Sequence, residues 1–128
     1  MTVDVSREHW IETYKSLISI SIEGFKFSAL ANGGAAVALL TYLGNVAGKS
    51  APVPDMRYPM TSYIAGLVFV GIAMLFAYSA QYTLLEKGGA AEHHRVMHRR
   101  LLVLAAFCYF ASLVAFGWGS WQAVENFG

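Results

Sequence analysis

The amino-acid sequence predicts an all-α integral membrane protein in which three transmembrane helices follow an N-terminal amphipathic helix. Hydrophobic residues make up 56% and charged residues 13% of the 128 residues, whereas soluble domains carry about 25% charged residues. Three long stretches, 27–48, 59–85 and 101–124, contain no charged residue at all. Each is long enough to cross a bilayer as a helix, and a backbone in lipid has to satisfy its own hydrogen bonds. Together the residues form one membrane domain.

Residues 4–25 have the pattern of an amphipathic helix. At 100° per residue one arc is apolar, and it comprises Trp10, Ile11, Tyr14, Leu17, Ile18, Ile22 and Phe25. The opposite arc carries polar and charged residues, among them Glu12, Lys15 and Glu23. We expect this helix to lie flat at the membrane surface. Docking on a partner helix or on a neighbouring protomer is the alternative, and continuity with the first span is compatible with both.

The connections between the spans carry helix-stop signals. All three prolines, Pro52, Pro54 and Pro59, lie between the first two spans, where proline ends a helix or occupies its first turn. The residues Glu86-Lys87-Gly88-Gly89 predict a stop and a turn after the second span. From Ala90 the chain is expected to re-enter a helix that runs into 101–124.

Small residues in the spans predict close approach between helices, within one protomer or between protomers. On the first span, Asn32 shares a face with small residues and is expected to form hydrogen bonds across helices. Small residues four apart occur on the second and third spans as well. The predicted packing or oligomer interface comprises Ala29, Asn32, Gly33, Ala36, Ala73, Ala77, Ala111 and Ala115.

A histidine-rich segment precedes the third span. His94 and His98 are four residues apart and share a helix face, which is a spacing that suits a metal ion. However, Arg95, Arg99 and Arg100 would repel a cation, so we expect a basic band at the lipid headgroups and no metal. A pH-sensing role of His93, His94 and His98 is the remaining alternative.

The uncharged spans argue against an enzyme. Proton relays and coupled transporters keep ionisable residues at membrane depth, and haem ligation between helices requires histidines there. All four histidines lie outside the three spans, and no serine or threonine in them has a base nearby. We therefore expect no catalytic residue and no cofactor. A basic soluble module for nucleic acid is also missing.

The distribution of Lys and Arg predicts the orientation. Seven basic residues flank the side of the N-terminus and the second connection, whereas the other side has only Lys49 and Arg57. This asymmetry favours a cytoplasmic N-terminus and an outward C-terminus. Short connections and the lack of an Asn-X-Ser/Thr site on the outer side favour a bacterial-type inner membrane.

Two functions fit these features. The first is a protein that self-assembles in the bilayer and forms a pore or permeabilises the membrane, and the layout is similar to that of holin-like or toxin-like effectors. Its pore would be lined by polar groups of the spans, which are Asn32, Thr41, Ser79, Gln81 and Ser112. The second is an accessory or scaffold subunit that binds a larger membrane complex through its spans and N-terminal helix. A redox or metal-handling protein is a third, weaker hypothesis. In each case the partners are membrane lipid and other copies or membrane proteins.

Overall fold

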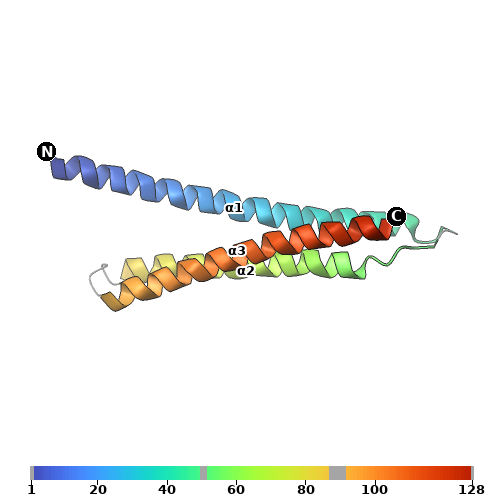
Figure 1. Cartoon of the computed structure of the whole chain (residues 1–128). Coiled ribbons are helices and arrows are strands. Elements are labelled where there is room, and N and C mark those ends of the chain that lie inside the picture. The colour runs from blue at the N-terminus through green and yellow to red at the C-terminus, as the bar shows by residue number, and fades with distance from the viewer. Residues whose placement is uncertain (1, 50–51, 87–91, 128) are drawn as a thin grey trace.

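The computed structural model shows three long helices (Figure 1): α1 (Thr2–Val46), α2 (Arg57–Glu86) and α3 (Glu92–Phe127). It describes residues 2–49, 52–86 and 92–127, and the side chains of 5–49, 52–83 and 96–127. All three helices are long and apolar enough to cross a membrane. The predicted all-α membrane class is therefore confirmed at this level. The turn expected at Lys87-Gly88-Gly89 lies outside the described residues.

Helices α2 and α3 form an antiparallel hairpin and lie side by side along their length (Figure 1). Small residues seven apart form the seam between them, which is the spacing of a coiled coil. On α2 the buried residues of this seam are Pro59, Gly66, Ala73 and Ala80, and on α3 they are Ala105, Ser112 and Gly119. A Cβ on Gly119 would lie 2.9 Å from Ser62 Cβ. Close backbone approach between α2 and α3 thus follows a seven-residue spacing, whereas the sequence pattern predicts it at small residues four apart.

Helix α1 is a single straight helix that runs through both the amphipathic segment and the first predicted span (Figure 1). No proline interrupts the chain between Thr2 and Val46, so nothing breaks the backbone hydrogen bonding near Lys26. The amphipathic segment is therefore not a separate helix but the first half of α1, and its orientation relative to a membrane surface stays a prediction. At 1.5 Å per residue α1 is about 68 Å long, more than twice the hydrocarbon thickness of about 30 Å.

The three helices meet most closely at the end where α1 and α3 finish. Ala36 and Leu39 of α1 are buried against Met56 and Tyr63. The Tyr63 hydroxyl donates a hydrogen bond to Ser120 Oγ at 3.2 Å, so the ring connects α2 to α3 at the level of this core. Towards its N-terminus α1 diverges from the α2–α3 hairpin (Figure 1). This divergence shapes the sites described below.

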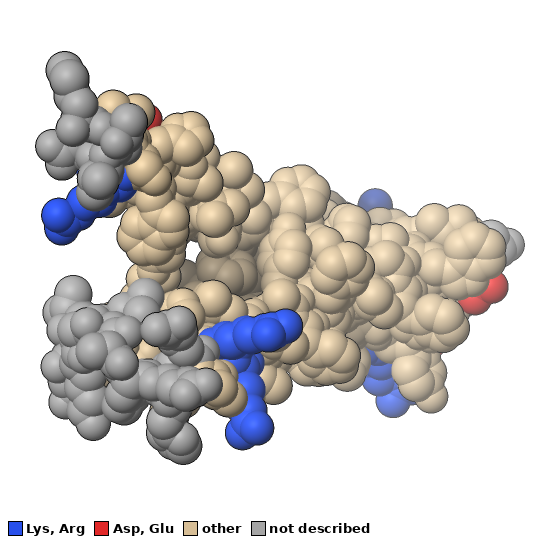
Figure 2. All heavy atoms as spheres, turned by 60° about the vertical axis from the view of Figure 1, so that its left-hand side comes forward, with Lys and Arg blue, Asp and Glu red and all other residues tan. Residues whose placement is uncertain are grey.

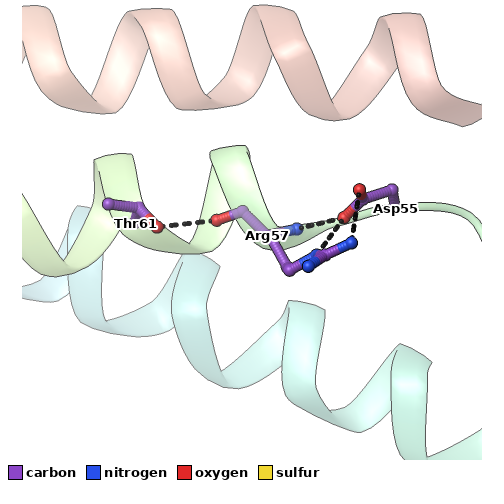
Figure 3. A network of polar contacts seen from close by, with 3 residues as sticks. All are labelled: Asp55, Arg57 and Thr61. Carbon is purple, nitrogen blue, oxygen red and sulfur yellow. Dashed lines mark hydrogen bonds and ion pairs between the residues drawn. The ribbon is translucent and has the colours of Figure 1, made fainter.

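Asp55 holds the first turn of α2 (Figure 3). Its Oδ1 accepts a hydrogen bond from the Arg57 backbone N–H at 3.1 Å, and its carboxylate pairs with the Arg57 guanidinium. The backbone bond satisfies one of the N–H groups that a helix start leaves without a partner. The Arg57 side chain and backbone hydrogen bonds lower the pKa of Asp55 below its ordinary value of 3.8.

This pKa shift predicts that α2 begins to fray in acid. A lowered folded-state pKa contributes stability that is present above the ordinary value and is lost as the pH falls through the folded value. We therefore expect the Arg57 amide to lose protection against hydrogen exchange, relative to amides in the middle of α2, as the pH falls below 3.8. In Asp55→Ala the same amide should be poorly protected at every pH. Equal protection in both proteins at neutral pH would contradict this role of Asp55.

Candidate functional site

A buried polar cluster joins all three helices at their crossing point. Ser112 of α3 donates its hydroxyl proton to the Gly66 carbonyl of α2 at 2.7 Å. Because that proton is used, Ser28 of α1 is the donor in the 2.7 Å contact between its Oγ and Ser112 Oγ. Asn32 Nδ2 donates to the Ser28 carbonyl at 3.0 Å and to Ser112 Oγ at 3.2 Å. All three side chains are fully buried, so the cluster fixes the helices against one another.

Gly66 provides the space that this cluster needs. A Cβ at Gly66 would overlap Asn32 Oδ1 and Cγ, so one of its Cα hydrogens points at the amide. Asn32 Oδ1 is buried and has no conventional hydrogen-bond donor among the described residues. A weak Cα–H···O contact from Gly66 is thus its nearest compensation. A glycine is therefore needed at position 66 because Asn32 occupies the space of a Cβ, and not because the backbone has a positive φ there.

The predicted interface residues do not all lie at this junction. Asn32, Ala36 and Ala73 are buried within the protomer, and Asn32 does bond across helices. The others are half-buried: Ala29, Gly33, Ala77, Ala111 and Ala115. Ala111 and Ala115 line a shallow apolar depression with aromatic residues of α2 and α3. A Cβ on Gly33 would meet only Leu67 Cδ2 at 3.7 Å, an ordinary contact.

Sequence reasoning missed Ser28 and Gly66. Ser28 lies four residues before Asn32, so the two form a polar pair on one face of α1. That spacing was a detectable signal. Gly66 carried no such signal in the sequence, because a glycine in α2 does not by itself indicate close packing. Gly71 of the same helix is exposed and has nothing within 4 Å of an added Cβ. Only the rotation of α2 in the bundle distinguishes the two.

The register of the hairpin defines its uncharged band. Ser112 lies opposite Gly66, and His98 Nδ1 lies 2.9 Å from the Ala80 carbonyl. In this register the uncharged residues 59–77 of α2 face the uncharged residues 101–119 of α3. That band is about 28 Å long at 1.5 Å per residue, close to the hydrocarbon thickness of about 30 Å.

Helix α1 is offset relative to this band. Its own uncharged stretch begins at Phe27, but Gly24 and Phe25 already lie against Tyr109, inside the band. A Cβ on Gly24 would be 3.4 Å from Tyr109 Oη, and the rings of Phe25 and Tyr109 are 5.9 Å apart. Glu23 and Lys26 flank these contacts in sequence, so they lie level with the uncharged part of α2 and α3.

Glu23 and Lys26 form an ion pair on the side of α1 that faces away from the hairpin. Lys26 Nζ lies 2.8 Å from Glu23 Oε1, and the two side chains are 61% and 68% exposed. Glu23 is nine residues after Tyr14, which places it on the opposite side of the helix. The outward polar face of α1, which we define as Glu12, Lys15, Ser19, Glu23 and Lys26, thus extends into the uncharged band.

A groove of about 720 Å³ separates the N-terminal half of α1 from the hairpin. Figure 2 shows it as a hollow between the two, with Lys and Arg side chains on either side. Five residues of the predicted apolar arc line it: Tyr14, Leu17, Ile18, Ile22 and Phe25. Of the seven residues of the arc, Tyr14, Ile18 and Phe25 are half-buried, whereas Leu17 and Ile22 in the groove and Trp10 and Ile11 outside it are exposed. The apolar face of the amphipathic segment is thus turned towards the chain's own α2 and α3.

Polar groups gather at one end of the groove. The Tyr14 hydroxyl donates to Gln81 Oε1 at 2.7 Å and bridges α1 to α2. His98 lines the same end, and its Nδ1 lies 2.9 Å from the Ala80 carbonyl. Since a carbonyl accepts only, Nδ1 carries the proton and Nε2 remains available. The opposite end is apolar and is closed by Phe25 and Tyr109.

The polar residues expected to line a pore have other positions in the protomer. Asn32 and Ser112 are fully buried in the polar cluster, and Gln81 lies in the groove. Thr41 and Ser79 are exposed, but each hydroxyl bonds to the carbonyl four residues earlier and is partly satisfied there. Asn32 and Ser112 therefore cannot line a path in this arrangement.

The structure places only part of the histidine-rich segment. The side chains of His93, His94 and Arg95 lie outside the described residues. Arg99 and Arg100 are exposed on the first half of α3, next to His98. Among the side chains that the structure does describe, no three metal-ligating groups gather in one place. Of the three arginines predicted to lie at the lipid headgroups, only Arg99 and Arg100 have described side chains, and their place at the headgroups stays a prediction.

Comparison with known proteins identified no relative: no family model, no curated protein and no solved structure matches this chain.

Proposed function

We propose that this protein self-assembles in a bilayer through the outward polar face of α1 and encloses a hydrated path across the membrane. The observation that carries the proposal is the Glu23–Lys26 ion pair, which lies level with the uncharged band and faces away from the rest of the protomer. Charged groups in membranes almost always face a protein interior or a water-filled cavity. Lipid tails provide neither a protein interior nor a water-filled cavity. Further copies of the chain, packed with the same face towards a common axis, provide both.

The face is suited to contact with copies of itself. It alternates in sign along the helix, with Glu12 and Glu23 as acids and Lys15 and Lys26 as bases. Opposite charges on neighbouring α1 helices can pair at this spacing, while water fills the remaining volume. Several copies around an axis form a closed ring, which is the usual symmetry of homo-oligomers.

The proposed location and orientation in the membrane follow the sequence. Three helices long and apolar enough to cross a membrane indicate a membrane protein. The excess of Lys and Arg on the side of the N-terminus favours a cytoplasmic position of that side, in a bacterial-type inner membrane. We further propose that the protein acts through assembly and not as an enzyme, because its buried polar groups connect helices.

Mass measurement in lipid tests the proposal. We expect the protein in lipid nanodiscs to form a complex of several identical chains, and we expect vesicles containing it to release a trapped small dye. A chain that stays monomeric in nanodiscs and leaves dye release at the level of empty vesicles would overturn the proposal. Recovery only with other membrane polypeptides, covering the same face, would favour the accessory-subunit function instead.

A further inference from the structure

We propose that the groove between α1 and the hairpin binds one acyl chain of an anionic phospholipid, with the headgroup at its polar end. The groove volume of about 720 Å³ lies within the range of about 300–1,000 Å³ that is usual for small-molecule sites. A second copy of this chain is a poor occupant, since residues of α1, α2 and α3 of one protomer already line the groove. The proposal does not depend on self-assembly.

The polarity of the groove matches the polarity of a lipid. Its lining from Tyr14 to Phe25 extends over about 16 Å at 1.5 Å per residue, about half the hydrocarbon thickness, or one leaflet. The polar end, with Tyr14, Gln81 and His98, lies beyond the uncharged band, next to Arg99. The apolar end lies inside the band, between Phe25 and Tyr109. A phospholipid in the adjacent leaflet is oriented in the same way, with its headgroup at the polar end of the groove and its acyl chain towards the apolar end.

Charge favours an anionic headgroup. No acidic residue is among the described residues that line the groove. Arg99 follows the lining residue His98 directly, and Arg7 lies seven residues before Tyr14, on the same face of α1. Figure 2 shows Lys and Arg side chains on both sides of the hollow. Arginine binds phosphate oxygens through paired N–H donors.

The polar end also offers uncharged partners. The Tyr14 hydroxyl donates its hydrogen bond to Gln81 Oε1, and no hydrogen bond from Gln81 Nε2 is found among the described residues. The two N–H donors of this amide can bind the oxygens of a phosphate or an ester. The apolar wall includes small and flexible side chains, such as Ala77, Ala106 and Met74, between its larger aliphatic and aromatic ones, and the small ones leave room for a methylene chain.

Native mass spectrometry of protein released from vesicles of equal parts phosphatidylglycerol and phosphatidylcholine tests this site. We expect the wild-type protein to retain phosphatidylglycerol in preference. Ala106→Trp, which fills the groove from an exposed position, should lose most of the retained lipid. Val103→Trp is the matched control, because Val103 is 61% exposed on α3 and does not line the groove, and it should retain lipid like the wild type.

A second variant tests the charge without filling the groove. Arg99→Gln should reduce the preference for phosphatidylglycerol over phosphatidylcholine about tenfold, which is the usual effect of a hydrogen bond to a charged group. Equal retention by Ala106→Trp and the wild type would overturn the groove as the site. Equal retention of the two lipids by the wild type would overturn the anionic headgroup. Retention is measured per protomer, so either failure leaves the proposal of self-assembly standing.

Discussion

Replacing Gly66 with alanine is expected to force α1 away from the α2–α3 hairpin at the level of the polar cluster. The added methyl group would overlap Asn32 Oδ1 and Cγ, so the amide has to leave its position and lose its bonds to Ser28 and Ser112. Overpacking of a buried site typically costs about 1–3 kcal/mol. Each lost hydrogen bond between helices adds about 0.6 kcal/mol on average. The midpoint of unfolding by SDS, followed by circular dichroism, should fall accordingly.

The same helix offers a matched control. A Cβ on Gly71 has nothing within 4 Å, so Gly71→Ala should leave the midpoint unchanged or raise it through helix propensity. Adding Asn32→Ala to Gly66→Ala removes the overlapping group, so the double variant should be more stable than the sum of the single changes predicts. Equal midpoints for Gly66→Ala and Gly71→Ala would show that Gly66 does not accommodate Asn32.

Replacing the Glu23–Lys26 ion pair with two leucines is expected to abolish both assembly and dye release. Once Glu23→Leu and Lys26→Leu are combined, this part of α1 is apolar, and lipid tails solvate it as well as another helix does. Charged residues at the centre of a spanning helix each cost about 2.5–3.5 kcal/mol on insertion, so their removal also removes the reason to exclude lipid. We expect a monomer in nanodiscs and dye release equal to that of empty vesicles.

Exchange of the two charges is the control for this variant. Glu23→Lys with Lys26→Glu keeps an ion pair three residues apart on the same face, so assembly and release should persist. If the leucine variant assembles and releases dye like the wild type, the outward polar face is not the contact between copies. If the exchange variant also fails, the direction of the pair matters, and the simple account of a polar hydrated face is wrong.

The three helices differ in how closely they follow the prediction from the sequence. The hairpin follows the uncharged stretches closely, since α2 extends over Arg57–Glu86 where 59–85 was predicted. Helix α3 begins at Glu92, which confirms that a helix runs from the second connection into the third span. The N-terminal part of α1 has the predicted amphipathicity, but its apolar face covers a groove of its own protomer. Of the polar cluster only the bonding of Asn32 across helices was predicted, although the spacing of Ser28 and Asn32 was a further signal.

By itself, the sequence determined that the chain forms three helices long and apolar enough to cross a membrane and that residues 4–25 have one apolar and one polar face. These properties depend on local composition and periodicity, because a long uncharged stretch in lipid has to form its hydrogen bonds within one helix. Only the tertiary structure decided the rotation and the axial offset of each helix. These depend on contacts between distant residues, such as Gly66 with Asn32 and Gly24 with Tyr109, and they place Glu23 and Lys26 level with the apolar band and leave the groove open beside it.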